Sequence, residues 1–141
     1  MVIIDTNVLS ELMRPAPADA VLAWFAAQSA QSLFTTTVTE AEILYGVALL
    51  PEGQRRTAFM EAAIAMFEQD FADRVLPFDR AAARVYAALV VRRREAGTPI
   101  AQFDAQIAAI ARSRGAAIAT RNVSDFDNLD IDILNPWAIR K

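Results

Sequence analysis

The chain offers carboxylates and few other reactive groups for chemistry. It contains no His and no Cys, and its single Lys is the last residue, Lys141. These absences exclude a Ser-His-Asp or Cys-His nucleophile pair, a zinc site of thiolates and imidazoles, a Schiff-base lysine and a P-loop. Carboxylate, hydroxyl, amide, tyrosine and arginine groups remain. Carboxylates around a hard metal ion are the chemistry that this set suits best.

Three acidic residues stand where such a set could form. Asp5 directly follows an apolar run at 2–4, Glu42 lies about one turn into the helix after a second strand, and Asp104 begins a later helix. The carboxyl ends of parallel strands meet at one edge of a sheet, where ligands bind. We therefore expect Asp5 and Glu42 at this edge, with the segment 120–122 that follows a fourth strand. Asp104 joins them if its helix begins there.

Each acid also has a purely structural interpretation. Asp5 and Asp104 are both good helix N-cap residues, and Glu42 could be a solvated helix residue beside Glu40. Further acids near the C-terminus are typical of a solvated turn: Asp125, Asp127, Asp130 and Asp132.

Two considerations favour the functional interpretation. Asp104 lies among apolar residues, Ile100, Phe103 and Ile107, and a carboxylate that is removed from water needs a partner. Carboxylates close to one another raise each other's pKa unless a cation intervenes. Because no Lys is available nearby, Mg²⁺ or Mn²⁺ is the cation that we expect.

The apolar pattern predicts strands that alternate with helices. Strands are expected at 2–4, 33–36, 74–78, 116–119 and 131–133. Helices are expected at 8–13, from 19, from an N-cap at Thr37 or Thr39 to the break at 51–53, and at 54–70, 79–94 and 103–114, with 125–127 in a loop. In the third of these helices the apolar stripe is Ile43, Leu44, Val47 and Ala48. This alternation indicates α/β layers around a short, mostly parallel central sheet.

Length and charge set the remaining limits. The chain has 141 residues, of which 55% are hydrophobic, so one domain over 1–141 can bury a core. Its formal net charge of −3 does not mark it as a binder of polyanions. No apolar run approaches the roughly 18 residues of a membrane span, and no basic segment precedes the first apolar run. We expect a cytoplasmic protein that has no contact with a membrane.

Five short segments carry a family resemblance through their order and spacing. They are 3–8 (IIDTNV), 39–46 (TEAEILYG), 76–79 (LPFD), the segment around Asp104, and 119–122 (ATRN). Together they resemble PIN-domain proteins, and most closely the VapC and FitB type toxins of bacterial toxin–antitoxin pairs. The resemblance extends to 135–137 and so covers nearly the whole chain. It implies a single PIN domain over 1–141, with a PIN-like three-layer α/β/α fold.

The resemblance also implies an activity. The family members are ribonucleases in which three or four acids bind Mg²⁺ or Mn²⁺ and activate water against an RNA phosphodiester. By position, Asp5, Glu42 and Asp104 match the three best-defined acids, and we expect Asp5 and Asp104 to bind the metal. Such a metal-dependent endoribonuclease needs an activated water and charge neutralisation on the phosphate, both of which a hard cation provides.

The fourth acidic position of the family departs from the pattern. Here it is Asn122, an amide that can offer a neutral oxygen ligand or a hydrogen bond to a bound water. Asp125, three residues later, could supply the missing charge, and the turn that carries it could equally be solvated. Thr120 resembles the hydroxyl that orients a neighbouring carboxylate.

Partners follow from the same resemblance. We expect a homodimer formed near 8–13 or 81–91, because 55% apolar residues leave exposed apolar surface on a small chain. We also expect a cognate VapB/FitA-type antitoxin whose tail places a cationic side chain, such as Arg, in the acidic groove. A group of arginines could contact RNA phosphates or could be a solvated face: Arg92, Arg93, Arg94, Arg112, Arg114 and Arg121.

Other functions remain to be weighed. A phosphoacceptor receiver domain needs a Lys after a late strand, which is absent, and a haloacid-dehalogenase-like phosphatase needs Asp at position 7, where this chain has Asn7. The serious alternative is a catalytically weak PIN-fold module that acts mainly as the partner of a DNA-binding antitoxin in a regulatory complex. Metal-dependent RNA cleavage by the purified chain separates the two.

Overall fold

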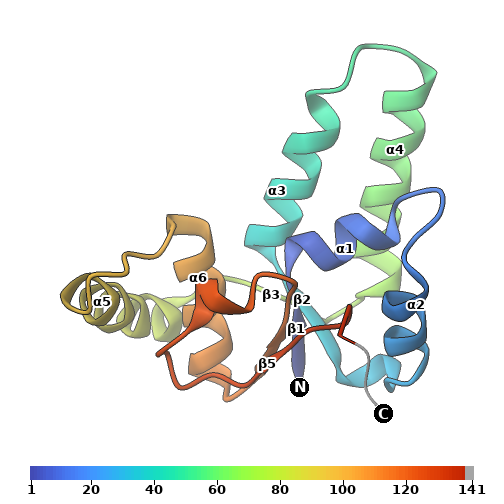
Figure 1. Cartoon of the computed structure of the whole chain (residues 1–141). Helices are drawn as coiled ribbons and strands as arrows, with labels where there is room; N and C mark the ends of the chain where they lie inside the picture. Colours follow the sequence, from blue (N-terminus) through green and yellow to red (C-terminus); the bar gives the residue numbers. More distant parts are fainter. Residues whose placement is uncertain (139–141) are drawn as a thin grey trace.

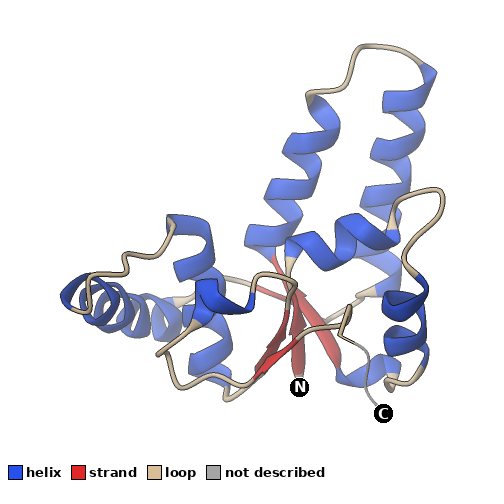
Figure 2. Cartoon of the chain, in the orientation of Figure 1, coloured by secondary structure: helices blue, strands red, loops and turns tan. Residues whose placement is uncertain are grey.

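The computed structural model describes residues 1–138, in which short strands alternate with helices (Figures 1 and 2). In chain order the elements are β1 (Val2–Ile4), α1 (Thr6–Leu12), α2 (Asp19–Ala26), η1 (Ala30–Ser32), β2 (Leu33–Thr36), α3 (Thr37–Ala48), α4 (Gln54–Ala65), η2 (Met66–Asp70), β3 (Val75–Leu76), α5 (Arg80–Glu95), α6 (Gln102–Arg114), β4 (Ala117–Ala119), η3 (Val123–Phe126) and β5 (Ile133–Leu134). None of the helices within these residues is both long and apolar enough to cross a bilayer.

The strands form one sheet in the order β3-β2-β1-β4-β5, and every pairing is parallel. In the centre, Ile3 of β1 lies opposite Phe34 of β2 on one side and Ile118 of β4 on the other. The chain moves outward from β1 to β2 and β3, and then returns to add β4 and β5 on the other side. The order therefore reverses between β1 and β4, and crevices at the carboxyl ends of two such strands are where open α/β sheets bind ligands.

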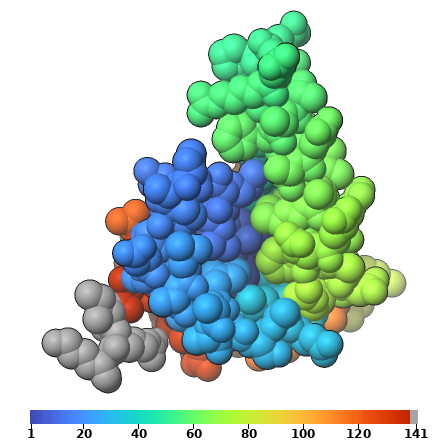
Figure 3. All heavy atoms as spheres, turned by 90° about the vertical axis from the view of Figure 1, so that its right-hand side faces the viewer, coloured from blue at the N-terminus to red at the C-terminus, as the bar shows by residue number. Residues whose placement is uncertain are grey.

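Helices cover both faces of the sheet, so the expected three-layer α/β/α fold is confirmed. Neighbouring residues of β1 point to opposite faces: Ile3 packs in a core with α5 and α6, and Ile4 in a core with α1, α2 and α4. Helix α6 is the most buried, because its run of Ala and Ile residues is inaccessible from Ala105 to Ala111 except at Gln106. The α3–α4 hairpin projects from this body (Figures 1 and 3).

Several boundaries differ from those expected from the sequence. The N-cap of α3 is Thr36, not Thr37 or Thr39, because the Thr36 hydroxyl at the end of β2 accepts a hydrogen bond from the Thr39 amide at 3.1 Å. Ala48, expected in the apolar stripe, is exposed. The helix expected over 54–70 changes to a π-helix at Met66, where the Phe71 amide bonds to the Met66 carbonyl. This wider turn lets Phe71 enter the core.

The C-terminal segment also departs from expectation. The 125–127 loop lies largely within the 3-10 helix η3, and the last strand begins at Ile133 and not at 131. The physical reason is the left-handed backbone of Asn128 and Asp130, with φ of 63° and 57°, which bends the chain away from an extended conformation. The segment between β4 and β5 is therefore a folded turn against α5 and α6.

Candidate active site

Asp5 is the most restrained acid of the protein. It is only 4% exposed and stands at the carboxyl end of β1, where its backbone amide donates to the Ala119 carbonyl of β4 at 3.0 Å. Its Oδ1 accepts from the Thr6 amide at 2.8 Å, which makes it the N-cap of α1. Its Oδ2 accepts from the Thr120 hydroxyl at 2.8 Å. Asp5 is therefore both a helix cap and an oriented carboxylate at the point where the strand order reverses between β1 and β4.

Asn7 and Thr120 join the ends of β1 and β4 around this carboxylate. The Asn7 Nδ2 group donates to Asp5 Oδ2 and to Thr120 Oγ1, each at 3.1 Å, and its Oδ1 accepts from the Arg121 amide at 3.1 Å. The expected orienting role of Thr120 thus agrees with its contacts. No role at the site was expected for Asn7, although a carboxamide two residues after a buried Asp is a usable signal for a second donor.

Glu42 reaches the same edge from α3. Its Oε1 accepts from the Thr6 hydroxyl at 2.7 Å, and the Thr39 hydroxyl lies 3.1 Å from that of Thr6. Thr6 therefore connects the two acids, because its amide binds Asp5 and its hydroxyl binds Glu42. This role of Thr6 was not expected from the sequence, where its position directly after Asp5 is the signal that points to it.

Asp104 lies in the first turn of α6 and faces Glu42 across a hollow of about 280 Å³, which Ala101, Gln102 and Phe103 also line. The start of α6 therefore lies at the carboxyl edge of the sheet, as the functional interpretation of Asp104 requires. Burial, followed by the charges of Asp5, Asp125 and Glu42, raises the pKa of Asp104 to about 6.

The pKa values of the other two acids move in the same direction. Burial is the main cause for Asp5 and for Glu42, and it outweighs the hydrogen bonds from Thr120 and Thr6 that favour their charged forms. The Asp125 charge adds to the rise at Asp5, and the Asp5 charge adds to the rise at Glu42. These carboxyl groups therefore lie within electrostatic range of one another, and a cation among them would relieve the repulsion.

Asn122 and Asp125 follow β4 on the same side. The Asn122 amide donates to the Thr120 hydroxyl at 3.1 Å, and its carbonyl accepts from the Asp125 amide at 3.1 Å. Both side chains are exposed. The charge of Asp125 acts on both Asp5 and Asp104, so the turn brings this carboxylate toward the site. Its role as a ligand stays a prediction.

The donors fit a hard divalent cation. All of them are oxygens, two carboxylates are oriented by hydroxyl and amide donors, and their pKa values are raised as a group. Within residues 1–138, no three acidic side chains are grouped closely enough to enclose an ion as they stand. Mg²⁺ suits such an open arrangement, because it keeps several of its waters and binds through one or two carboxylates.

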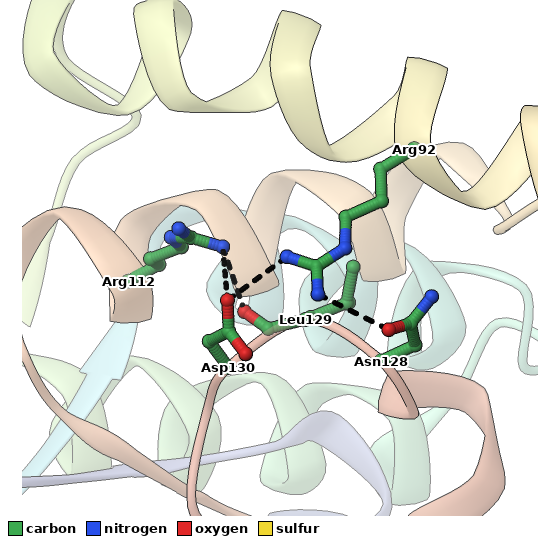
Figure 4. A network of polar contacts seen from close by, with 5 residues as sticks. All are labelled: Arg92, Arg112, Asn128, Leu129 and Asp130. Atoms are coloured by element: carbon green, nitrogen blue, oxygen red, sulfur yellow. Dashed lines mark hydrogen bonds and ion pairs between the residues drawn. The ribbon is translucent and has the colours of Figure 1, made fainter.

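The remaining acids of the C-terminal turn do not join this set. Asp130 accepts from Arg92 at 2.9 Å and lies 3.5 Å from Arg112, and hydrogen bonding to Arg92 lowers its pKa (Figure 4). Asp127 and Asp132 are exposed, in agreement with the solvated turn. Among the arginines considered for phosphate binding, Arg93 is buried and directed at backbone carbonyls, so it is not available to RNA.

Comparison with known proteins finds similar chains that match over nearly the full length. The family model for the PIN domain matches residues 2–131. The chain is 42% identical over 137 residues to VapC ribonuclease Y4jK of Sinorhizobium fredii, covering 97% of this chain and 98% of that protein. It is 36% identical to toxin FitB of Neisseria gonorrhoeae, with 97% and 99% covered. The structure of FitAB bound to an IR36 DNA fragment contains a similar chain, with a TM-score of 0.94 at 35% identity, and 100% and 99% covered.

The raised pKa of Asp104 predicts how the metal-free protein responds to pH. Because the folded carboxyl has a pKa of about 6 against 3.8 ordinarily, the folded state holds a proton that the unfolded state releases. The free energy of unfolding should therefore fall as pH rises from about 4 to about 6. Asp104→Asn should raise it at pH 7 by about 1 kcal/mol, after allowance for solvent screening. Urea unfolding in EDTA at several pH values measures both effects.

Asp130 supplies the matched control for this prediction. Its pKa is lowered by Arg92, so its charged form is favoured in the folded state, and Asp130→Asn should lower stability at pH 7. A stability loss in Asp104→Asn, with an unchanged pH slope, would contradict the electrostatic account of the site.

Proposed function

The chain belongs to the PIN domain family, and on that basis we propose that it is a metal-dependent endoribonuclease, the toxin of a toxin–antitoxin pair. The observation that carries the proposal is the convergence of Asp5, Glu42 and Asp104. Asp5 and Glu42 are joined through Thr6, and Asp104 faces Glu42 across a common hollow. Two similar proteins support the assignment, because one is a VapC ribonuclease, Y4jK, and the other is the toxin FitB.

Each residue of the site has its own role in this proposal. Asp5 and Asp104 would hold Mg²⁺ or Mn²⁺, which would supply an activated water and neutralise charge on the phosphodiester. Thr120 and Asn7 fix the direction of the Asp5 carboxylate. Glu42 has one oxygen engaged by Thr6, and its Oε2 has no hydrogen-bond partner among the described residues, so it can accept a proton from water.

The substrate is RNA in this proposal, and the acidic site must act on it against charge repulsion. A metal held among the carboxylates would remove that repulsion locally. The exposed ring of Phe103, 53% accessible, stands beside Asp104 at the rim of the hollow. An exposed aromatic ring at this point suits an unpaired base of single-stranded RNA, since bases stack on aromatic side chains.

An antitoxin is the second partner that we propose. The similar FitB chain was solved in a complex, FitAcB of Neisseria gonorrhoeae, at 35% identity and a TM-score of 0.87, with 99% of this chain and 100% of that chain covered. In this protein a groove of about 420 Å³ runs between α1, α3 and α4, with apolar residues such as Met13 and Phe59 and with Glu42 in its wall. It can receive an apolar segment that ends in a cationic side chain near the acids.

A homodimer is also proposed, and the structure favours one of the two expected surfaces. The apolar residues of α1 are largely used in the core, with Val8 and Leu9 buried. Helix α5 keeps an exposed face that includes Val91, which is 52% accessible. Dimer contacts therefore belong to α5 in this proposal. The location in the cytoplasm stays a prediction.

The nuclease proposal predicts a clear loss on substitution of Asp5. Asp5→Asn keeps the side-chain volume and the helix cap but removes the charge, so metal-dependent cleavage of RNA should fall by at least about 100-fold. Asp127→Asn, an exposed acid of the neighbouring turn, is the control and should keep full activity. The measurement is cleavage of total RNA by partner-free protein with and without Mg²⁺ or Mn²⁺.

Two outcomes would decide against this assignment. Full activity of Asp5→Asn in Mg²⁺ would show that the site is wrong. No cleavage by the folded wild-type chain in either metal would favour the catalytically weak module that acts through its partner.

The contribution of Asp125 can be tested separately from activity. If Asp125 supplies the charge that Asn122 lacks, Asp125→Ala should weaken Mn²⁺ binding by about 10-fold, because the cluster loses a carboxylate. Asn122→Asp should tighten binding for the opposite reason. Calorimetric titration with Mn²⁺ measures both, and unchanged affinity in Asp125→Ala would confine the site to Asp5, Glu42, Asp104 and Asn122.

The partner proposal predicts the composition of the purified complex. Expressed together with the product of the adjacent gene, this chain should co-purify with it as a complex that contains two copies of the toxin, measured by light scattering. Val91→Glu in α5 should reduce the mass of the partner-free protein to that of a monomer. A wild-type monomer at micromolar concentration, with no co-purifying product, would contradict both parts.

A further inference from the structure

Arg93 is a buried cation with no buried anion beside it. The residue is 6% exposed and lies in the last turn of α5. Among residues 1–138, no carboxylate lies within ion-pair distance of its guanidinium. An arginine in such a place needs another set of acceptors, because a buried charge without hydrogen bonds is costly.

Backbone carbonyls from two separate segments supply these acceptors. Arg93 Nε donates to the Thr98 carbonyl at 2.7 Å and to the Thr98 hydroxyl at 3.2 Å. Arg93 Nη1 donates to the Asp125 carbonyl at 2.7 Å and to the Asp127 carbonyl at 3.3 Å. One planar group therefore ties the connection that leads into α6 to the turn η3.

One segment leads into the helix that carries Asp104, and the other contains Asp125. Thr98 lies in the short connection before α6, whose first turn contains Asp104, and η3 contains Asp125 itself. The bond to the Asp125 carbonyl fixes the backbone from which that carboxylate projects. The Arg93 charge also acts on the site, because it partly offsets the carboxylates that raise the pKa of Asp104.

The preceding residue on the same helix, Arg92, holds only the part of the turn at Asn128 and Asp130. Arg92 donates to Asp130 Oδ2 at 2.9 Å and to Asn128 Oδ1 at 3.1 Å, and Arg112 donates to the Leu129 carbonyl at 3.0 Å (Figure 4). These contacts hold the left-handed residues Asn128 and Asp130 in place. Arg92 thus carries the same guanidinium in the same turn of α5, but its side chain is 40% exposed and makes no hydrogen bond or ion pair with Asp125.

We propose that Arg93 is a positioning residue of the metal site, which holds the Asp125 turn and the entry to α6 in register so that Asp125 and Asp104 serve one ion. The inference rests on the proposed function, since it presumes metal binding at this site. The geometry of the guanidinium is essential, because a Lys ammonium keeps the charge but lacks the planar fork that reaches both segments.

A purely structural role is the alternative, and metal affinity separates the two. In Arg93→Lys the affinity for Mn²⁺, measured by calorimetry on folded protein, should fall by about 10-fold or more, as losses of groups that orient metal ligands do. Arg92→Lys is the matched control and should bind Mn²⁺ within about twofold of wild type, because it loosens only the Asn128–Asp130 half. Thermal unfolding of both variants in EDTA establishes that they are folded at the titration temperature.

A double-mutant cycle tests whether Arg93 acts through Asp125. With Asp125→Asn already present, Arg93→Lys should cost clearly less affinity than it does alone, since one of the carboxylates that it positions is gone. Additive effects on Mn²⁺ affinity would overturn the proposal, and so would wild-type affinity in Arg93→Lys. No Mn²⁺ binding by the wild-type chain would overturn the proposed metal site itself, and the inference with it.

A measurement on the wild type covers the case in which Arg93→Lys does not fold. If Arg93 positions the turn before metal binds, the Asp125 and Asp127 amides, which bond to the Asn122 and Ser124 carbonyls, should be protected from hydrogen exchange in EDTA. Protection that arises only after Mn²⁺ is added would overturn the proposal, because the ion and not Arg93 would then order the turn.

Discussion

The burial of the Asp5 carboxylate at the end of the central strand is the constraint on which the rest of the site depends. A carboxylate that is 4% exposed is tolerated only with strong compensation, and here both of its oxygens accept hydrogen bonds, from Thr6, Asn7 and Thr120. These donors come from the start of α1 and the end of β4. The same bonds that satisfy the charge therefore also lock together the two strands between which the sheet order reverses.

Repulsion among the acids sets the electrostatic character of the site. The fold brings Glu42 and Asp104 toward Asp5 from two further helices, and the pKa of each of the three is raised mainly by burial. Repulsion and desolvation of these carboxylates destabilise the metal-free protein. A cation that binds among them relieves this unfavourable free energy, which strengthens its binding. Carboxyl groups that lower the stability of the folded protein are typical of functional sites, where the needs of binding or catalysis outweigh those of folding.

Arginine is used in two ways around this centre. Arg92 and Arg112 meet an exposed carboxylate, Asp130, at the molecular surface, where screening by solvent makes ion pairs weak. Arg93 is buried and donates to backbone carbonyls and to the Thr98 hydroxyl, so its position is specified by hydrogen-bond geometry. These two neighbouring residues of α5 therefore have different roles. The helix directs the Arg93 side chain toward the core and the Arg92 side chain toward solvent.

The sequence by itself determined the alternation of strands and helices and the types of residue at the candidate site, because apolar periodicity and residue type are local properties. It also indicated that Asp5 and Glu42 lie at the same edge of the sheet, a consequence of parallel topology. Only the tertiary structure decided that Asp104 faces Glu42, that Thr6 connects Asp5 to Glu42, that Asn7 connects Asp5 to Thr120, and that Arg93 binds the Asp125 turn. These contacts join segments far apart in the chain, and their geometry depends on helix packing and on left-handed backbone at Asn128 and Asp130, which no short sequence pattern specifies.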